Sequence, residues 1–139
     1  MQRFENRIAL VTGAASGIGR ATARRLASEG ASVLCADQNM AGAEETAASL
    51  NGKGTAWLLD VADPASCERA VAETLRVHGR IDVLGNIAGI GSFGHAADID
   101  DATWQRVISV NLTGVFQMMR FVQHQILIIR QHTIVGGRI

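Results

Sequence analysis

Three glycines stand where a short apolar run gives way to a helical pattern, within the sequence TGAASGIG of residues 12–19. The apolar run, residues 8–11, is typical of a buried strand. Because glycine has no Cβ, backbone N–H groups at Gly13 and Gly17 can come within contact distance of an anion. The helix that begins near Gly17 also points its positive end at that anion. The segment therefore predicts a site for the diphosphate of a dinucleotide.

A glycine-rich turn alone is weak support for such a site, because tight strand-to-helix turns also use glycine for structural reasons. Here a strand pattern precedes the turn and a helix pattern follows it, which is the context that the motif requires. The spacing is Gly-x-x-x-Gly-x-Gly. In the helix expected over residues 18–29, Ile18, Ala21 and Leu26 are apolar, and the arginines are expected to point outward.

Asp37 is the second candidate, at the end of the next apolar run, residues 32–36. It lies at about the distance beyond the glycines where an acidic residue meets the adenosine ribose of a dinucleotide. A carboxylate there accepts hydrogen bonds from both ribose hydroxyls and repels a 2′-phosphate. The next residues, Gln38 and Asn39, bring no positive charge, so the sequence favours NAD over NADP. The alternative, an exposed aspartate that caps a turn, stays open.

Strand and helix patterns alternate along the rest of the chain. Further strands are expected at residues 55–61 and 81–88, and further helices at 40–50, 64–78 and from 101 into the 120s. Residues 133–139 read as the opening of a fifth strand. This alternation predicts parallel βαβ units, and hence an α/β fold with a Rossmann-like, doubly wound parallel sheet that stops after four to five strands. The length fits one domain, residues 1–139, with an atypical apolar tail at 121–139.

Composition narrows the class of protein. The formal net charge is zero, which gives no basic surface for nucleic acid. No apolar run approaches the length of a membrane span, and we expect no signal peptide, because residues 1–7 lead directly into a short strand pattern. The two cysteines, Cys35 and Cys67, are expected to be buried free thiols, with no metal site, which fits a reducing cytoplasm.

Polar residues follow the expected third and fourth strands, at the sheet edge where parallel sheets bind ligands. Asp60 could accept from an adenine amino group or simply signal the start of the next helix. Five motifs then occur in one order along the chain: Thr12-Gly13-x3-Gly17-Ile18-Gly19, Asp37, Leu59-Asp60-Val61, Asn86-x-Ala88-Gly89 and Val110-Asn111-Leu112-Thr113-Gly114. Over residues 7–119 this order resembles the N-terminal, cofactor-binding half of the short-chain dehydrogenase/reductase family.

The resemblance implies a role for each motif. The diphosphate and nearby ribose would be contacted by Gly13, Ser16, Gly17, Ile18 and Gly19. Asp37 would select the ribose, and Asp60 and Val61 would hold adenine. The inner half of the cofactor would be lined by Asn86, Ala88, Gly89 and Val110. Asn111 would support a proton relay, with an ordinary helix residue as the alternative. Ile87 departs from the family, which usually has a second asparagine there.

The family transfers a hydride between nicotinamide and an alcohol or ketone, using a tyrosine as acid and base, a lysine and a serine. This sequence has no tyrosine, and its single lysine, Lys53, falls in the wrong half. His95 could approach the nicotinamide, although a solvated loop histidine is the alternative. We therefore expect the 139 residues to bind NAD without catalysis and to form homo-oligomers through the helix after residue 101. Two alternatives for the function stay open: a non-catalytic nucleotide-binding or oligomerising module, and a non-functional fragment.

Overall fold

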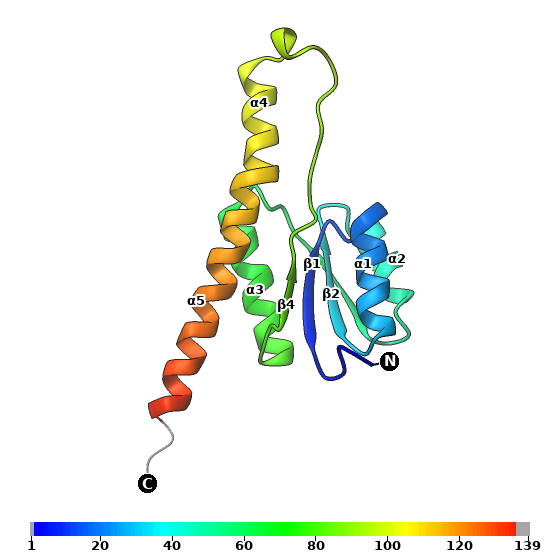
Figure 1. Ribbon diagram of the computed structural model, residues 1–139, viewed down its shortest axis with the longest axis vertical. Helices are drawn as coiled ribbons and strands as arrows, with labels where there is room; N and C mark the ends of the chain where they lie inside the picture. Colours follow the sequence, from blue (N-terminus) through cyan, green and yellow to red (C-terminus); the bar gives the residue numbers. More distant parts are fainter. Residues whose placement is uncertain (1, 136–139) are drawn as a thin grey trace.

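Four parallel strands form one sheet in the computed structural model, which describes residues 2–135 and the side chains up to residue 125. The strands are β1 (Ile8–Thr12), β2 (Ser32–Asp37), β3 (Gly54–Leu58) and β4 (Val83–Gly85). Their order in the sheet is β3-β2-β1-β4, and every pairing is parallel (Figure 1). The expected doubly wound α/β fold of the Rossmann type is confirmed.

Helices cover both faces of this sheet. Figure 1 shows α1 (Gly17–Ser28) and α2 (Met40–Ala48) on one side, with α3 (Pro64–His78) and α5 (Gly114–Val135) on the other. Between β4 and α5 come the short helix η1 (Ala96–Asp98), α4 (Asp101–Ile108) and one π-helical turn, η2 (Ser109–Thr113). None of the helices within residues 2–135 has the length and apolar character to cross a membrane.

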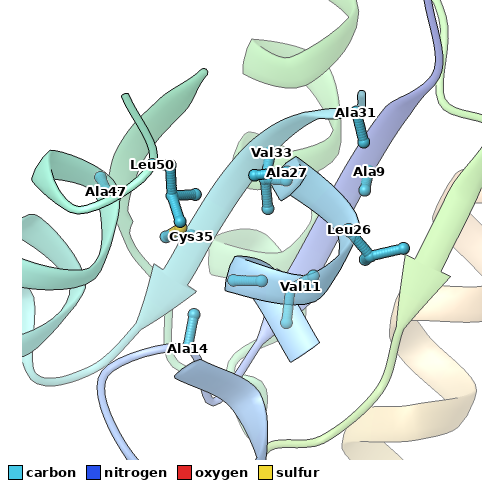
Figure 2. Close-up of a cluster of buried hydrophobic side chains, with 11 residues drawn as sticks. Ala9, Val11, Ala14, Leu26, Ala27, Ala31, Val33, Cys35, Ala47 and Leu50 are labelled. Carbon is cyan, nitrogen blue, oxygen red and sulfur yellow. The ribbon is translucent and has the colours of Figure 1, made fainter. Parts of the chain in front are cut away.

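Each face of the sheet has its own core, because successive residues of a strand point to opposite faces. On β1, Ala9 and Val11 pack toward α1, whereas Leu10 packs toward α3. Figure 2 shows the first core, where small side chains from β1 and β2 meet α1 and the end of α2. Cys35 lies in this core and Cys67 in the other, both buried and free, as expected. Burial raises the pKa of each thiol to about 11.

Capping side chains set the starts of three helices, α2, α3 and α4. Asp63 accepts from the N–H groups of Ala65 and Ser66 at 3.0 and 3.2 Å, and Pro64 follows it at the first helical position. Asp100 accepts from the N–H of Thr103 at 2.7 Å and so starts α4. The expected helix starts at residues 64 and 101 are therefore confirmed.

Three expected elements differ from the structure. The third strand ends at residue 58 rather than 61, and the fourth covers only residues 83–85 of the expected 81–88. The fifth strand is wrong over residues 133–135, which are the last turn of α5. No glycine or proline interrupts residues 115–135, so nothing in that stretch stops the helix. Residues 136–139 lie outside the described residues.

The buried face of α1 also differs from the expected one. Ile18 is 75% exposed and Ala21 is exposed. Arg20 turns inward instead, donates to the carbonyl oxygen of Ala15 at 2.5 Å and pairs with Glu45 at 3.1 Å. The residues that face the sheet are Gly19, Ala23, Leu26 and Ala27. The contact between the glycine turn and the helix start fixes this phase, which apolar spacing alone does not reveal.

An ion-pair cluster ties the N-terminus to the end of α1. The Glu29 carboxylate, which is 6% exposed, accepts hydrogen bonds from the guanidinium groups of Arg3 and Arg25. The hydrogen bond from Arg3, helped by Arg25, lowers the pKa of Glu29 to about 2. The Phe4 N–H also donates to the Glu29 carbonyl oxygen at 2.9 Å.

The Glu29→Gln variant should be less stable than the wild type at pH 7, because it removes the charge that both arginines meet. An unfolded glutamate has a pKa of about 4.3, so the depressed folded value stabilises the fold above that pH. The stability difference should shrink as the pH falls from about 4.3 toward 2. Urea unfolding at pH 7, 4 and 3 measures it, with Glu44→Gln, at an exposed position of α2, as the matched control. A difference that stays constant with pH would contradict the ion-pair assignment.

Candidate functional site

A cleft of about 520 Å³ lies where the carboxyl ends of the four strands meet the starts of the following segments. It is lined by Gly13, Ser16, Gly17, Ile18, Gly19, Ala36, Asp37, Gln38, Leu59, Asp60, Val61, Ile87, Ala88, Gly89, Ile90 and Val110. The fold thus gathers every residue expected to bind cofactor except Asn86 into one cavity. Ile90, which no motif singled out, also forms part of the wall.

The glycine turn brings backbone against backbone. A Cβ at Gly19 would lie 1.9 Å from the carbonyl oxygen of Gly13, and a Cβ at Gly13 would lie 2.8 Å from the backbone N and Cα of Ala88. Gly13 also has a φ of +67°, which disfavours other residues. The sequence predicted that these glycines allow a close approach of the backbone. In the structure, the glycine turn makes this approach to its own helix start and to the segment after β4.

Open space remains on the other side of this turn. At Gly17, which has a φ of +50°, an added Cβ would meet no atom within 4 Å. Within the described residues, α1 has no side-chain cap at Ser16 and no acidic residue in its first turn. Its first N–H groups are therefore left for another acceptor, and the helix dipole favours an anion there. This cradle fits a diphosphate in both shape and hydrogen-bond donors.

Thr12 holds the two sides of the cleft together, a role that the sequence analysis missed. Its hydroxyl accepts from the N–H groups of Ile87 and Ala88 at 3.0 and 3.1 Å and donates to the Gly85 carbonyl oxygen at 3.3 Å. Thr12 is only 1% exposed. A hydroxyl at the end of an otherwise apolar strand is the sequence signal that could have revealed it, because a buried hydroxyl needs partners.

The Asp37 carboxylate holds the backbone around it and can still accept further hydrogen bonds from a ligand. Its Oδ2 accepts from the Ala15 N–H and its Oδ1 from the Asn39 N–H, both at 2.9 Å. The carboxylate therefore does hold a turn, as the alternative reading proposed. Each oxygen has a second lone pair, so the group keeps acceptor capacity along the cleft wall.

Asp60 and Val61 form the wall after β3. The Oδ1 of Asp60 accepts from the Ala62 N–H at 2.9 Å, and the Asp60 N–H donates to the Ser66 hydroxyl at 3.1 Å. Asp60 thus helps to shape the start of α3 while its exposed carboxylate lines the cleft. Val61 is buried and packs in the core beneath it.

Asn111 holds the opposite wall through its side chain. Its Oδ1 accepts from the Ile90 N–H at 2.9 Å, and its Nδ2 donates to the Ile90 carbonyl oxygen at 2.8 Å. Asn111 occupies the middle of the π-helical turn and does not line the cleft, whereas its neighbour Val110 does. The alternative for Asn111 was an ordinary helix residue without a specific role. Its two hydrogen bonds instead fix the backbone at Ile90.

Other polar candidates lie away from the cleft. Lys53 directly precedes β3, at the opposite end of the sheet. His95 is an exposed residue just before η1 and does not line the cavity. Within the described residues, no three His, Cys, Asp or Glu side chains are grouped so that they could hold a metal ion.

Comparison with known proteins places this geometry in context. Residues 7–138 match the family model described as short chain dehydrogenase. The D-threitol dehydrogenase of Mycolicibacterium smegmatis is 40% identical over 128 residues, which cover 90% of this chain and 49% of that protein. The 2,3-dihydro-2,3-dihydroxybenzoate dehydrogenase of Bacillus subtilis is 40% identical over 135 residues, 95% of this chain and 52% of that protein.

A solved structure agrees with these matches. The 3-ketoacyl-(acyl-carrier-protein) reductase of Brucella melitensis, complexed with NADH, superposes with a TM-score of 0.82 at 36% identity. The match covers 84% of this chain and 49% of that one. The chain thus spans about half the length of the relatives it matches.

The Thr12→Val variant should lower the free energy of unfolding by about 2 kcal/mol, because it leaves two partly buried N–H groups without their acceptor. Thr12→Ser, which keeps the hydroxyl and removes only the methyl group, should lose less. Urea unfolding of the three proteins at pH 7 makes the comparison. Equal stability of the Val and Ser variants would show that the hydroxyl does not hold the β4 loop.

Proposed function

The chain belongs to the short-chain dehydrogenase family, and we propose that it forms the NAD-binding half of an oxidoreductase acting on an alcohol or ketone. The observation that carries the proposal is the cleft itself. It joins an uncapped helix start, a glycine turn and an acceptor carboxylate in one cavity. When bound, NAD or NADH would accept or supply the hydride.

The diphosphate would lie at the start of α1. There Gly17 leaves open space, and the N–H groups of the first helical turn have no side-chain acceptor within the described part of the chain. Ser16, Ile18 and Gly19 line the same end of the cavity. Ile18, whose exposure is otherwise unexplained, would regain apolar contact against the bound cofactor.

Asp37 would select NAD. Its two oxygens keep one acceptor position each, enough for the ribose hydroxyls. A 2′-phosphate would meet this negative charge with no compensating cation among the described residues that line the cleft, where the neighbouring Gln38 is neutral. The NADH complex of the Brucella reductase supports a nicotinamide dinucleotide in a cleft of this fold.

The rest of the cofactor would follow the remaining walls. Asp60 and Val61 would hold adenine, and Ala88, Gly89 and Val110 would line the inner half. Asn86, which precedes this segment in the chain, would contribute from outside the described cavity lining. Asn111 would act as a positioning residue that supports a proton relay, with its side chain held by Ile90. The NAD chemistry and the two buried thiols are consistent with a cytoplasmic protein.

Catalysis needs groups that these 139 residues do not supply. A tyrosine needs a nearby cation to act as an acid and base at neutral pH, because its ordinary pKa is about 10. The sequence has no tyrosine, and its lysine lies at the far end of β3. We therefore propose that the 139-residue chain binds NAD without turning it over.

Calorimetric titration tests the cofactor assignment. The purified chain should bind NAD more tightly than NADP, and Asp37→Asn should weaken NAD binding by roughly tenfold while narrowing the gap to NADP. Asp101→Asn, at an exposed position in the first turn of α4, is the matched control. Undetectable NAD binding by the folded wild type would refute the proposed function. NADH formation from alcohols by a chain of verified mass would refute only its non-catalytic part.

An exposed apolar stripe on the long α4–α5 rod supports self-association. Trp104, Leu112, Phe116 and Met119 are between 48% and 64% exposed, and the last three follow helical spacing. In Figure 1 this rod stands at the outer side of the molecule, with α3 between much of it and the sheet. Large exposed apolar stripes mark contact surfaces. We propose that a second copy of this chain covers the stripe.

The Phe116→Glu variant should shift the chain toward monomer, because it places a charge in the middle of the stripe. Sedimentation equilibrium at tens of micromolar protein measures the shift. Ala21→Glu adds the same charge at an exposed position of α1, on the other side of the sheet, and should leave the association unchanged. A wild-type chain that sediments as a monomer would contradict the proposed dimer.

A further inference from the structure

Helix α5 packs on the rest of the protein through a stripe that narrows toward the cleft. Gly114, Met118 and Val122 are buried and recur every four residues along one helix face. Met118 and Val122 fill the core beside α3. At the cleft end, the corresponding position carries only a hydrogen atom, so the helix comes closest to its neighbour there.

That neighbour is Val61, which lines the cleft. A Cβ at Gly114 would lie 2.8 Å from Cγ2, 2.9 Å from Cβ and 3.0 Å from the carbonyl oxygen of Val61. Contacts this short cannot be kept, so either Val61 or the helix would have to move.

Both movements would change the cleft. Val61 is held from behind, because the Cys67 thiol on α3 lies 3.5 Å from its carbonyl oxygen and donates to it. Its freest direction is therefore into the cavity. If α5 moved instead, it would carry Val110, four residues earlier in the same continuous helical rod, away from the same cavity.

We propose that Gly114 is a positioning residue that fixes the wall at Val61 and thereby sets the affinity for the adenine half of the cofactor. The inference rests on the proposed function, which places adenine at Asp60 and Val61. It goes beyond it by assigning cofactor affinity to a residue outside the cavity, on a helix that begins 53 residues later in the chain.

Titration with AMP, which carries only the adenine half, tests the proposal. Gly114→Ala should weaken binding of AMP by roughly tenfold, because overpacking on this scale is costly. NAD affinity should fall by a similar factor. Gly91→Ala is the matched control, since a Cβ at Gly91 meets no atom within 4 Å and the residue does not line the cleft. Titration well below the melting temperature separates affinity from stability.

A second substitution identifies the contact. Val61→Ala removes the Cγ2 atom nearest to the added methyl group and leaves the approaches of 2.9 and 3.0 Å to Cβ and the carbonyl oxygen. The double variant should therefore recover in part and bind AMP more tightly than Gly114→Ala alone. If Gly114→Ala fails to fold, the double variant should fold and bind AMP. A double variant that also fails to fold would overturn the proposal.

The remaining outcomes separate this inference from the proposed function. A wild type that binds neither AMP nor NAD refutes the proposed function and, with it, the inference. If the wild type binds AMP and folded Gly114→Ala binds it equally well, only the inference is overturned. A loss of stability without a loss of affinity has the same meaning, because it assigns Gly114 a purely structural role.

Discussion

Backbone contact between the β1–α1 turn and the segment after β4 is the constraint on which the cleft depends. Gly13 lies so close to Ala88 and Gly19 that no side chain fits at either glycine. This contact fixes the phase of α1, which leaves its first N–H groups facing the cavity rather than the core. The Thr12 hydroxyl secures the same junction from inside the sheet. The open helix start that could hold an anion therefore results from the close contact between the β1–α1 turn and the segment after β4.

The order of the elements and the position of the site could be predicted from the sequence, because both depend on local signals. Apolar runs identify buried parallel strands, and Asp63 or Asp100 identify helix starts. The carboxyl ends of parallel strands share one edge, so residues as distant as Gly17 and Gly89 could be placed in one cavity. Once the strands are assigned, the parallel topology determines which residues lie at this edge.

Features set by long-range contact could not be predicted in the same way. Apolar spacing suggested that Ile18 belongs to a buried face, whereas the glycine contact turns it outward. Strand β3 ends at residue 58 because pairing with β2 ends there, although the apolar pattern continues to Val61. The hydroxyl of Thr12 in an apolar strand indicates that it needs a partner, but the sequence does not indicate that this partner is Ile87, 75 positions away. Helical spacing likewise does not reveal the π turn that presents Asn111 to Ile90.

The link between Asn111 and Ile90 has a consequence for how such a cleft can diversify. The carboxamide pairs with the backbone N–H and carbonyl of residue 90 and does not depend on its side chain. Any amino acid except proline, which has no N–H to donate, can therefore stand at that position without loosening the wall. The position of the cleft wall at residue 90 is thus set by the backbone, whereas its shape is set by the side chain. Natural or engineered substitution at residue 90 can reshape the inner end of the cavity while the frame that holds it stays constant.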